Sequence, residues 1–137
     1  MFGDDRDTNE QSPMELLTTL IAACSAMDVV SILEKKRQEI ETYTIRVDAE
    51  QRDEYPQVLT RVDVVHAFEG PRVGEAAVRR AIELSASKYC PVNAMVSAGA
   101  TEVHHRYRIR AHAADPAEIE GEVMVTGPYR RPDVIDS

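Results

Sequence analysis

The chain has 137 residues, of which 43% are apolar and only 5% aromatic, so one domain with an aliphatic core is expected. Its 24 acidic and 16 basic residues give a formal net charge of -8. Such a surface repels phosphate backbones and anionic lipid, so neither nucleic acid nor membrane is expected as a partner. No stretch reaches the ~20 apolar residues of a membrane span. The acidic start does not resemble a secretory signal, so we expect a cytoplasmic protein with reduced thiols.

Residues 1–11 are polar, and we expect them to be loose. Ser12 begins a strong helix-start pattern, in which Ser12 caps, Pro13 occupies the first position and Glu15 completes a capping box. The apolar run over 16–38 contains no Gly or Pro. Because its apolar residues fall on more than one face, the sequence predicts a central helix that is covered on several sides.

The middle of the chain alternates between strand and helix patterns. β-branched residues predict strands over 42–47 and 58–68, and the polar segment between them is compatible with a hairpin. A helix is expected over 74–89, and Pro91 then starts a short helix that Gly99 closes.

The residues 101–113 alternate in polarity, which predicts a half-exposed strand with Val103, His105, Tyr107, Ile109 and Ala111 on one face. The other face carries a basic strip, which we interpret as solvated; it consists of Arg106, Arg108 and Arg110. The residues 114–137 form a C-terminal extension of the single domain 1–137, and 120–127 within it are compatible with one more strand.

Two cysteines, 66 positions apart, are the candidate chemical groups. Cys24 lies within the first helix, where a lone Cys is usually a core filler. Cys90 directly precedes Pro91, so free N–H groups at the helix start would favour a thiolate there, although a small residue filling a Cys-Pro corner fits equally well. Asp28, one turn after Cys24, could disfavour a thiolate, but its place on another edge of the helix indicates that it points elsewhere.

The segment SPMELLTTLIAACSAMDVVSILEKKRQ, followed by AVRRAIELSASKYCPV, resembles the OsmC/Ohr family of osmotically inducible and organic-hydroperoxide-resistance proteins. The resemblance covers roughly 11–110 and is closest to a branch with the SPMEL start. It implies an α+β fold whose antiparallel sheet wraps around a long central helix in an intertwined homodimer. It also implies a peroxidatic role for Cys24 and a resolving role for Cys90.

The chain departs from this family at two catalytic groups. The family arginine comes from a strand before the long helix, but Arg6 is the only basic residue there and its surroundings do not match. We expect the C-terminal extension to supply a replacement strand, with Arg130 and Arg131 as candidates to reach a thiolate. The family glutamate directly follows the helix-starting proline, whereas here Glu15 lies one residue later, about 100° around the helix.

The resemblance implies a thiol-dependent peroxidase that reduces organic hydroperoxides and is restored by an external dithiol. The alternative is a non-catalytic dimer of the same fold that binds a small hydrophobic molecule. We expect no cofactor and no metal, because His66, His104, His105 and His112 show no metal-site spacing. His104 and His105 are adjacent on a strand, so they should point to opposite faces.

Overall fold

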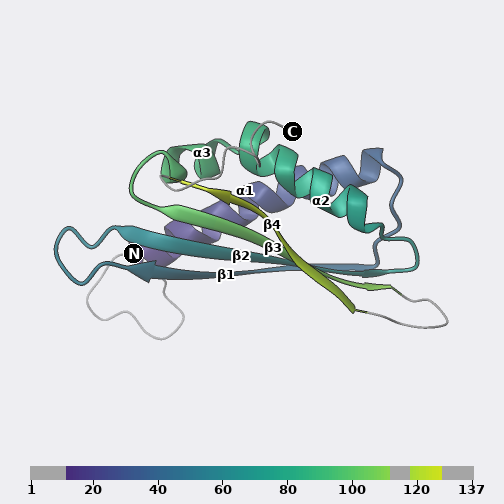
Figure 1. The fold of residues 1–137 in the computed structure, drawn as a ribbon, viewed down its shortest axis with the longest axis horizontal. Helices are drawn as coiled ribbons and strands as arrows, with labels where there is room; N and C mark the ends of the chain where they lie inside the picture. The colour runs from purple at the N-terminus through teal and green to yellow at the C-terminus, as the bar shows by residue number, and fades with distance from the viewer. Residues whose placement is uncertain (1–11, 112–117, 128–137) are drawn as a thin grey trace.

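A computed structural model describes residues 12–111 and 118–127. Within them, helices gather on one face of a four-stranded sheet (Figure 1), which confirms the predicted α+β class. The elements, in chain order, are α1 (Pro13–Lys35), β1 (Thr42–Gln51), β2 (Leu59–Gly70), α2 (Glu75–Leu84), the π-helical turn η1 (Ser85–Tyr89), α3 (Pro91–Ser97), β3 (Glu102–Ala111) and β4 (Glu118–Thr126).

The helix α1 begins as its sequence predicts. The backbone N–H of Glu15 donates to Ser12 Oγ at 3.2 Å, and the Ser12 hydroxyl donates to Glu15 Oε1 at 3.2 Å. The first of these bonds satisfies a backbone N–H that a helix start otherwise leaves unpaired. The helix then packs on the sheet through a buried set of apolar side chains, which includes Ile21, Val29 and Leu33.

The expectation that no stretch is long and apolar enough for a membrane span is wrong for α1. An 18-residue window of this helix has a mean hydropathy of 2.0, so by length and composition α1 could cross a membrane. Helices that form the core of globular proteins share these properties. In this fold, α1 lies against the sheet and α2, although part of its apolar surface remains exposed.

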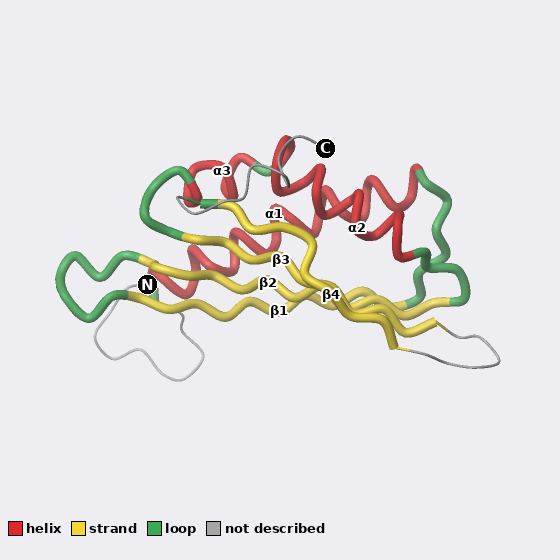
Figure 2. Tube along the Cα trace, viewed as in Figure 1, coloured by secondary structure: helices red, strands yellow, loops and turns green. Residues whose placement is uncertain are grey.

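The strand order is β1-β2-β3-β4, and the sheet is mixed. The strands β1 and β2 form the predicted hairpin, and β3 and β4 are also antiparallel. The strands β2 and β3 are parallel, so the expectation of a wholly antiparallel sheet is wrong in this detail. The reason is that α2, η1 and α3 form the connection between them and return the chain to the starting end of β2 (Figure 2).

The two faces of the sheet differ as the alternating pattern of β3 predicts. Val103, His105, Tyr107 and Ile109 are all buried, at 1% exposure or less. Because successive strand residues point to opposite faces, His104 lies on the other face, as expected. There it contacts two acidic side chains, Glu102 and Glu122.

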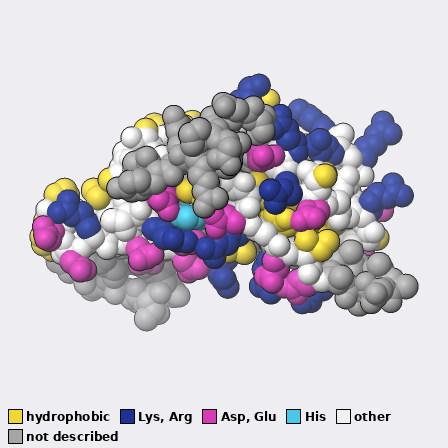
Figure 3. Space-filling model, in the orientation of Figure 1, with side chains coloured by type: hydrophobic (Ala, Val, Ile, Leu, Met, Phe, Trp, Pro, Cys, Tyr) yellow, Lys and Arg dark blue, Asp and Glu magenta, His cyan; other side chains and the backbone are white. Residues whose placement is uncertain are grey.

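The arginines of β3 form ion pairs on the outer face of the sheet. Arg106 lies 3.4 Å from Asp63, and both Arg108 and Arg110 pair with Glu118, at 2.6 and 3.3 Å. Figure 3 shows acidic and basic side chains intermixed on the face in view. Such exposed pairs add little stability. They agree with the interpretation of the basic strip as a solvated surface.

Candidate active site

The fold brings the two cysteine sulfurs into contact. Cys24 Sγ and Cys90 Sγ lie 2.8 Å apart, although 66 positions separate them in the sequence, and both are free thiols. The middle of α1 supplies Cys24, and the residue between η1 and α3 supplies Cys90. A disulfide requires a sulfur separation of about 2.05 Å. A displacement of less than about 1 Å would therefore suffice to join these two sulfurs.

Cys90 is the N-cap residue of α3, as its place before Pro91 predicts. The backbone N–H of Asn93 donates to Cys90 Sγ at 3.3 Å. The side chain is only 2% exposed, and this burial, together with the neighbouring Cys24, raises the pKa of Cys90 to about 12. The donor at the helix start lowers the pKa by less than burial raises it. The expectation that the cap position makes Cys90 an acidic thiol is therefore wrong.

Asp28 lies beside the two thiols, contrary to the sequence interpretation that it points elsewhere. One of its carboxylate oxygens and the two sulfurs all lie within 4.8 Å of one another. The hydroxyl of Ser85 donates to Asp28 Oδ2 at 3.0 Å and also lies 3.5 Å from Ser25 Oγ. Because η1 packs against this edge of α1, a side chain that would otherwise face solvent is directed toward the dithiol.

The set of Cys24, Cys90 and Asp28 offers three atoms that commonly bind zinc. Two thiolates on one tetrahedral zinc ion lie about 3.8 Å apart, since each Zn–S bond is about 2.3 Å long. The sulfurs here are separated by 2.8 Å. A metal would have to push them apart, so the geometry fits bond formation between the sulfurs better than metal ligation.

A buried hydrogen-bond network surrounds Cys90 on the sheet side, and Asn93 is its centre. The amide Nδ2 donates to the Ala86 carbonyl at 3.2 Å and to Thr126 Oγ1 at 3.3 Å. Oδ1 accepts from His105 Nε2 at 2.7 Å. Sequence reasoning missed Asn93. The signal that could have found it is a polar residue in a short helix, three positions after the N-cap Cys90.

A groove of about 600 Å³ lies between α1 and the end of α2, and neither cysteine lines it. Asp28 lies at its edge next to the thiols, and Tyr89 directly precedes Cys90. The remaining lining contains apolar, hydroxyl and basic side chains, and it consists of Ser31, Ile32, Lys35, Lys36 and Leu84. The groove could admit a molecule with an apolar part to the neighbourhood of the sulfurs.

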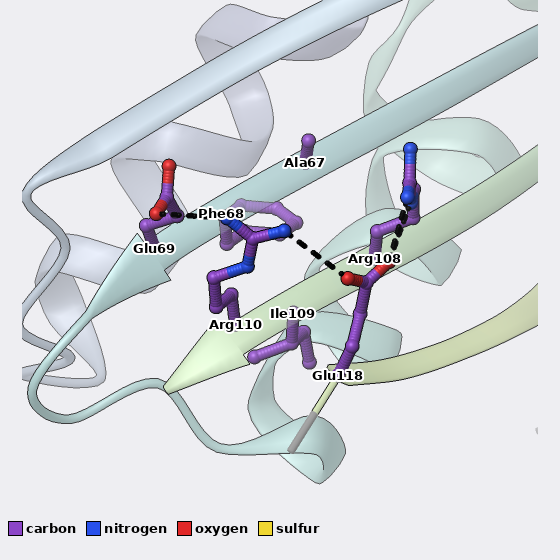
Figure 4. A pocket seen from close by; sticks show the side chains of 7 residues that line it. All are labelled: Ala67, Phe68, Glu69, Arg108, Ile109, Arg110 and Glu118. Atoms are coloured by element: carbon purple, nitrogen blue, oxygen red, sulfur yellow. Dashed lines mark hydrogen bonds and ion pairs between the residues drawn. The ribbon is translucent and has the colours of Figure 1, made fainter. Parts of the chain in front are cut away.

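A second, smaller hollow of about 140 Å³ lies at the far end of the sheet (Figure 4). Its rim is made by ion pairs, in which Arg110 bridges Glu69 and Glu118. It lies near the end of β3, whereas Asn93 joins the thiol region to His105, near the start of that strand. This hollow therefore belongs to the charged outer surface and not to the dithiol site.

The other predicted site residues are not brought to the thiols. Glu15 is exposed at the start of α1, where its contacts are those of a capping residue. It lies nine positions before Cys24, which corresponds to about 13 Å along the helix. Arg6, Arg130 and Arg131 lie outside the described residues.

The C-terminal extension does contain a strand, β4, which pairs with β3 at the edge of the sheet. Its last residue, Thr126, accepts a hydrogen bond from Asn93. The extension thus reaches the vicinity of Cys90, in accordance with the expectation that it adds a strand to the sheet.

Comparisons with known proteins agree with this architecture. The family model described as OsmC-like protein matches residues 3–106. The protein YhfA of Escherichia coli K12 is 39% identical over 100 residues, which are 73% of this chain and 74% of YhfA. A hypothetical protein from Aquifex aeolicus VF5, of known crystal structure, is 33% identical with a TM-score of 0.72, covering 77% of this chain and 78% of its own.

A crystal structure from Legionella pneumophila is described as an organic hydroperoxide resistance protein OsmC and predicted redox protein. It shares the fold with a TM-score of 0.54 at 11% identity, covering 75% of this chain and 72% of its own. The family match spans most of the chain, and the two cysteines that prompted the resemblance lie inside it. The chain belongs to the OsmC-like protein family.

Proposed function

We propose that this protein is a thiol-dependent peroxidase that reduces organic hydroperoxides through a sulfenic acid at Cys24 and a Cys24–Cys90 disulfide. The separation of 2.8 Å between the two sulfurs carries the proposal. Membership of the OsmC-like family supports a redox or peroxide-related function. The description of the Legionella pneumophila structure as a hydroperoxide resistance protein points the same way.

The exposure of the two thiols supports Cys24 as the residue oxidised first. Cys24 is partly exposed, whereas Cys90 is buried and has a raised pKa. In the first step, the Cys24 thiolate attacks a peroxide oxygen, the O–O bond breaks, and the alkoxide leaves as an alcohol after taking a proton. In the second step, Cys90 displaces hydroxide from the sulfenic acid and forms the disulfide. An external dithiol, which the cytoplasm would supply, then reduces the disulfide.

The groove that Asp28 borders supports an organic rather than an inorganic peroxide. Ile32, Leu84 and Tyr89 give it an apolar wall. Burial of an alkyl group against that wall would stabilise the bound hydroperoxide by about 25 cal/mol per Å². Hydrogen peroxide has no group that could make use of this wall.

A homodimer is proposed from the exposed surface of α1. Apolar side chains recur along it at alternating spacings of four and three, which is the pattern of a helix-packing stripe. The stripe consists of Leu16, Leu20, Ala23, Met27 and Val30, all of which are exposed. It lies beside Cys24, so a second copy of the chain would cover the thiol region.

Light scattering coupled to size exclusion tests the dimer. Leu20→Glu should convert it to a monomer, because a carboxylate would be buried without a partner. Met95→Glu provides a matched control, since Met95 is also exposed but belongs to α3 and not to the stripe on α1. A monomeric wild-type protein at micromolar concentration would exclude this assembly.

Peroxide consumption tests the enzymatic proposal. Purified protein with tert-butyl hydroperoxide and dithiothreitol should turn over many times, and Cys24→Ser should be inactive. Cys90→Ser should react once and stop at the sulfenic acid, which a dimedone adduct would reveal in the protein mass. Equal peroxide consumption by the wild type and the Cys24→Ser variant would exclude the proposal.

A ligand-binding function is the second candidate. Among the described residues, no arginine or lysine forms a hydrogen bond with either sulfur, and the groove has an apolar wall. This candidate predicts that an apolar fluorescent probe binds to the wild type and to Cys24→Ser with the same affinity. It also predicts that neither protein consumes hydroperoxide.

A further inference from the structure

Cys90 meets a chemical difficulty in the second step of the proposed reaction. Its thiol must lose a proton as its sulfur bonds to Cys24, and the hydroxide that leaves Cys24 must gain one. Cys90 is 2% exposed, so bulk water has little access to that proton. Asn93 N–H, its bonded donor, cannot accept a proton. A nearby base is therefore needed.

Asp28 is the ionisable side chain whose placement meets this need. A carboxylate oxygen lies within 4.8 Å of both sulfurs, a separation that one water or a small side-chain rotation can bridge. Proton carriers in resting sites are often this loosely placed and approach only as the reaction proceeds. We propose that Asp28 is the acid–base group of the dithiol, which carries the proton from Cys90 to the oxygen leaving Cys24. The inference rests on the peroxidase function proposed above.

The proton and electron balance of the step closes without a further reactant. The Asp28 carboxylate accepts the proton of the Cys90 thiol as the new S–S bond forms. The S–O bond of the Cys24 sulfenic acid breaks, and the departing hydroxide takes that proton from Asp28 and becomes water. Cys24 sulfur is reduced, Cys90 sulfur is oxidised, and Asp28 ends as a carboxylate, ready for another cycle.

Ser85 prepares Asp28 for this role. Its hydroxyl donates to Asp28 Oδ2 at 3.0 Å and so holds the carboxylate, whereas Asp28 Oδ1 accepts no hydrogen bond from the described residues. Asp28 also borders the groove, so the water produced has a route to solvent. The Ser85 hydroxyl and the two thiols lie beside the carboxylate, and the other charged or titratable side chains that line the groove with Asp28 are Lys35, Lys36 and Tyr89.

A single-turnover experiment separates the two steps. One equivalent of tert-butyl hydroperoxide is mixed with reduced protein, and samples are quenched over time with dimedone and then with an alkylating agent. Intact mass distinguishes the sulfenic-acid adduct from the disulfide. For Asp28→Asn at pH 7, we expect sulfenic-acid formation within about twofold of the wild type. We expect disulfide formation to slow by about 100-fold, which is the lower range for general acid–base catalysis.

Slower disulfide formation in Asp28→Asn would exclude a purely electrostatic role for Asp28. If Asp28 acted only as a negative charge, its removal would ease ionisation of the thiols and would accelerate disulfide formation. As a proton carrier, its removal slows that step. The slow step in Asp28→Asn should also become faster as the pH rises from 7 to 10, because the fraction of Cys90 present as thiolate increases with pH and the thiolate needs no base. Asp28→Glu should retain most of the rate.

Matched variants keep the outcome unambiguous. Glu34→Gln changes an exposed carboxylate on the same helix and should leave both steps unchanged. In Asp28→Asn the side-chain oxygen can still accept a hydrogen bond from Ser85, so the fold should be preserved. If the Asp28→Asn protein nevertheless unfolds, Asp28→Ser is a second neutral variant, and it must show the same slow step. If a folded neutral variant forms the disulfide at the wild-type rate, the proposed role of Asp28 is wrong, but the peroxidase function is unaffected. If the wild type forms no sulfenic acid, the proposed function itself fails.

Discussion

His66 and His105 stack against each other beneath the helices, with 5.8 Å between their ring centroids. Each has one ring nitrogen bonded, His66 Nδ1 to the hydroxyl of Tyr43 and His105 Nε2 to Asn93, both at 2.7 Å. The opposite nitrogens, Nε2 of His66 and Nδ1 of His105, have no partner among the described residues. Burial lowers the pKa of both rings, that of His105 to about 4, so both are neutral near pH 7.

We therefore expect stability to fall in mild acid. In the unfolded chain, His105 titrates near 6.5, whereas in the folded protein it titrates near 4. Between these values the unfolded state binds more protons, so the free energy of unfolding decreases as the pH falls from 6.5 toward 4. Each such histidine contributes a slope of about 1.4 kcal/mol per pH unit in that window. Urea unfolding at pH 5, 6, 7 and 8 measures how the free energy of unfolding changes with pH.

The variant His105→Gln is the control for this window. Gln can still donate a hydrogen bond to Asn93, but it does not titrate, so the slope between pH 5 and 6.5 should become about half as steep. Acidic groups with lowered pKa values, such as Asp63, act mainly below about pH 5 and therefore contribute little between pH 5 and 6.5. An unchanged slope in His105→Gln would show that His105 is not the group responsible.

The raised pKa of Cys90 predicts slow alkylation. At pH 7.5 the buried thiol is almost entirely protonated, and only the thiolate reacts with iodoacetamide. Peptide mass spectrometry should show Cys90 in the folded protein reacting at least about 100-fold more slowly than in urea. Its rate should continue to rise up to pH 11, because the pKa lies at about 12. A rate that levels off near pH 9 would contradict the raised pKa.

Local sequence signals were sufficient for most of the fold. The cap formed by Ser12 and Glu15, the restart at Pro91 and the alternation along β3 each correspond to the observed element. These signals act within one element, where the chain's own geometry determines the result. The parallel pairing of β2 with β3 was not predicted, because strand direction depends on the long connection between them.

The dithiol site was predicted less completely. The resemblance to a family singled out Cys24 and Cys90, whereas their spacing alone indicated no contact. Asp28 was misjudged because its direction depends on the packing of η1 against α1. The acidity expected for Cys90 was wrong for a similar reason, since burial is a property of the whole fold and outweighs the local donor from α3.

Gly121 on β4 is expected to tolerate no side chain. It lies opposite Tyr107, and a Cβ atom there would come within 2.6–2.9 Å of the phenol. Tyr107 is 1% exposed and is fixed by hydrogen bonds with Glu75 and Arg79, so its ring cannot easily move. Gly121→Ala should therefore destabilise the protein by about 1–3 kcal/mol.

Gly99 provides the matched control for that substitution. A Cβ atom at Gly99 would have its nearest neighbour at 3.9 Å, which is an ordinary contact. Gly99→Ala should be neutral or should stabilise the protein by about 0.4–1 kcal/mol, because it restricts the unfolded chain. Chemical denaturation of both variants measures the difference; equal stabilities would show that Tyr107 has room to move.

Asn93 joins three parts of the fold at Cys90, so its truncation should be costly. Asn93→Ala would leave the His105 Nε2–H, the Ala86 carbonyl and the Thr126 hydroxyl without their bonds, all in a buried environment. Leaving a buried polar group unpaired costs about 1–3 kcal/mol, and we expect a total loss of about 3 kcal/mol, since water partly fills the space.

The matched substitution on the same helix is Met95→Ala, at a residue that is 72% exposed. It should change the free energy of unfolding by no more than about 0.5 kcal/mol. Because the Asn93 side chain ties α3 to η1 and β4 through Ala86 and Thr126, Asn93→Ala should make Cys90 more accessible to iodoacetamide in the folded protein, whereas Met95→Ala should not. Comparing both variants by urea unfolding and by alkylation separates global loss of stability from local opening. If Asn93→Ala matched Met95→Ala in both measurements, the network would have no role in holding the resolving thiol.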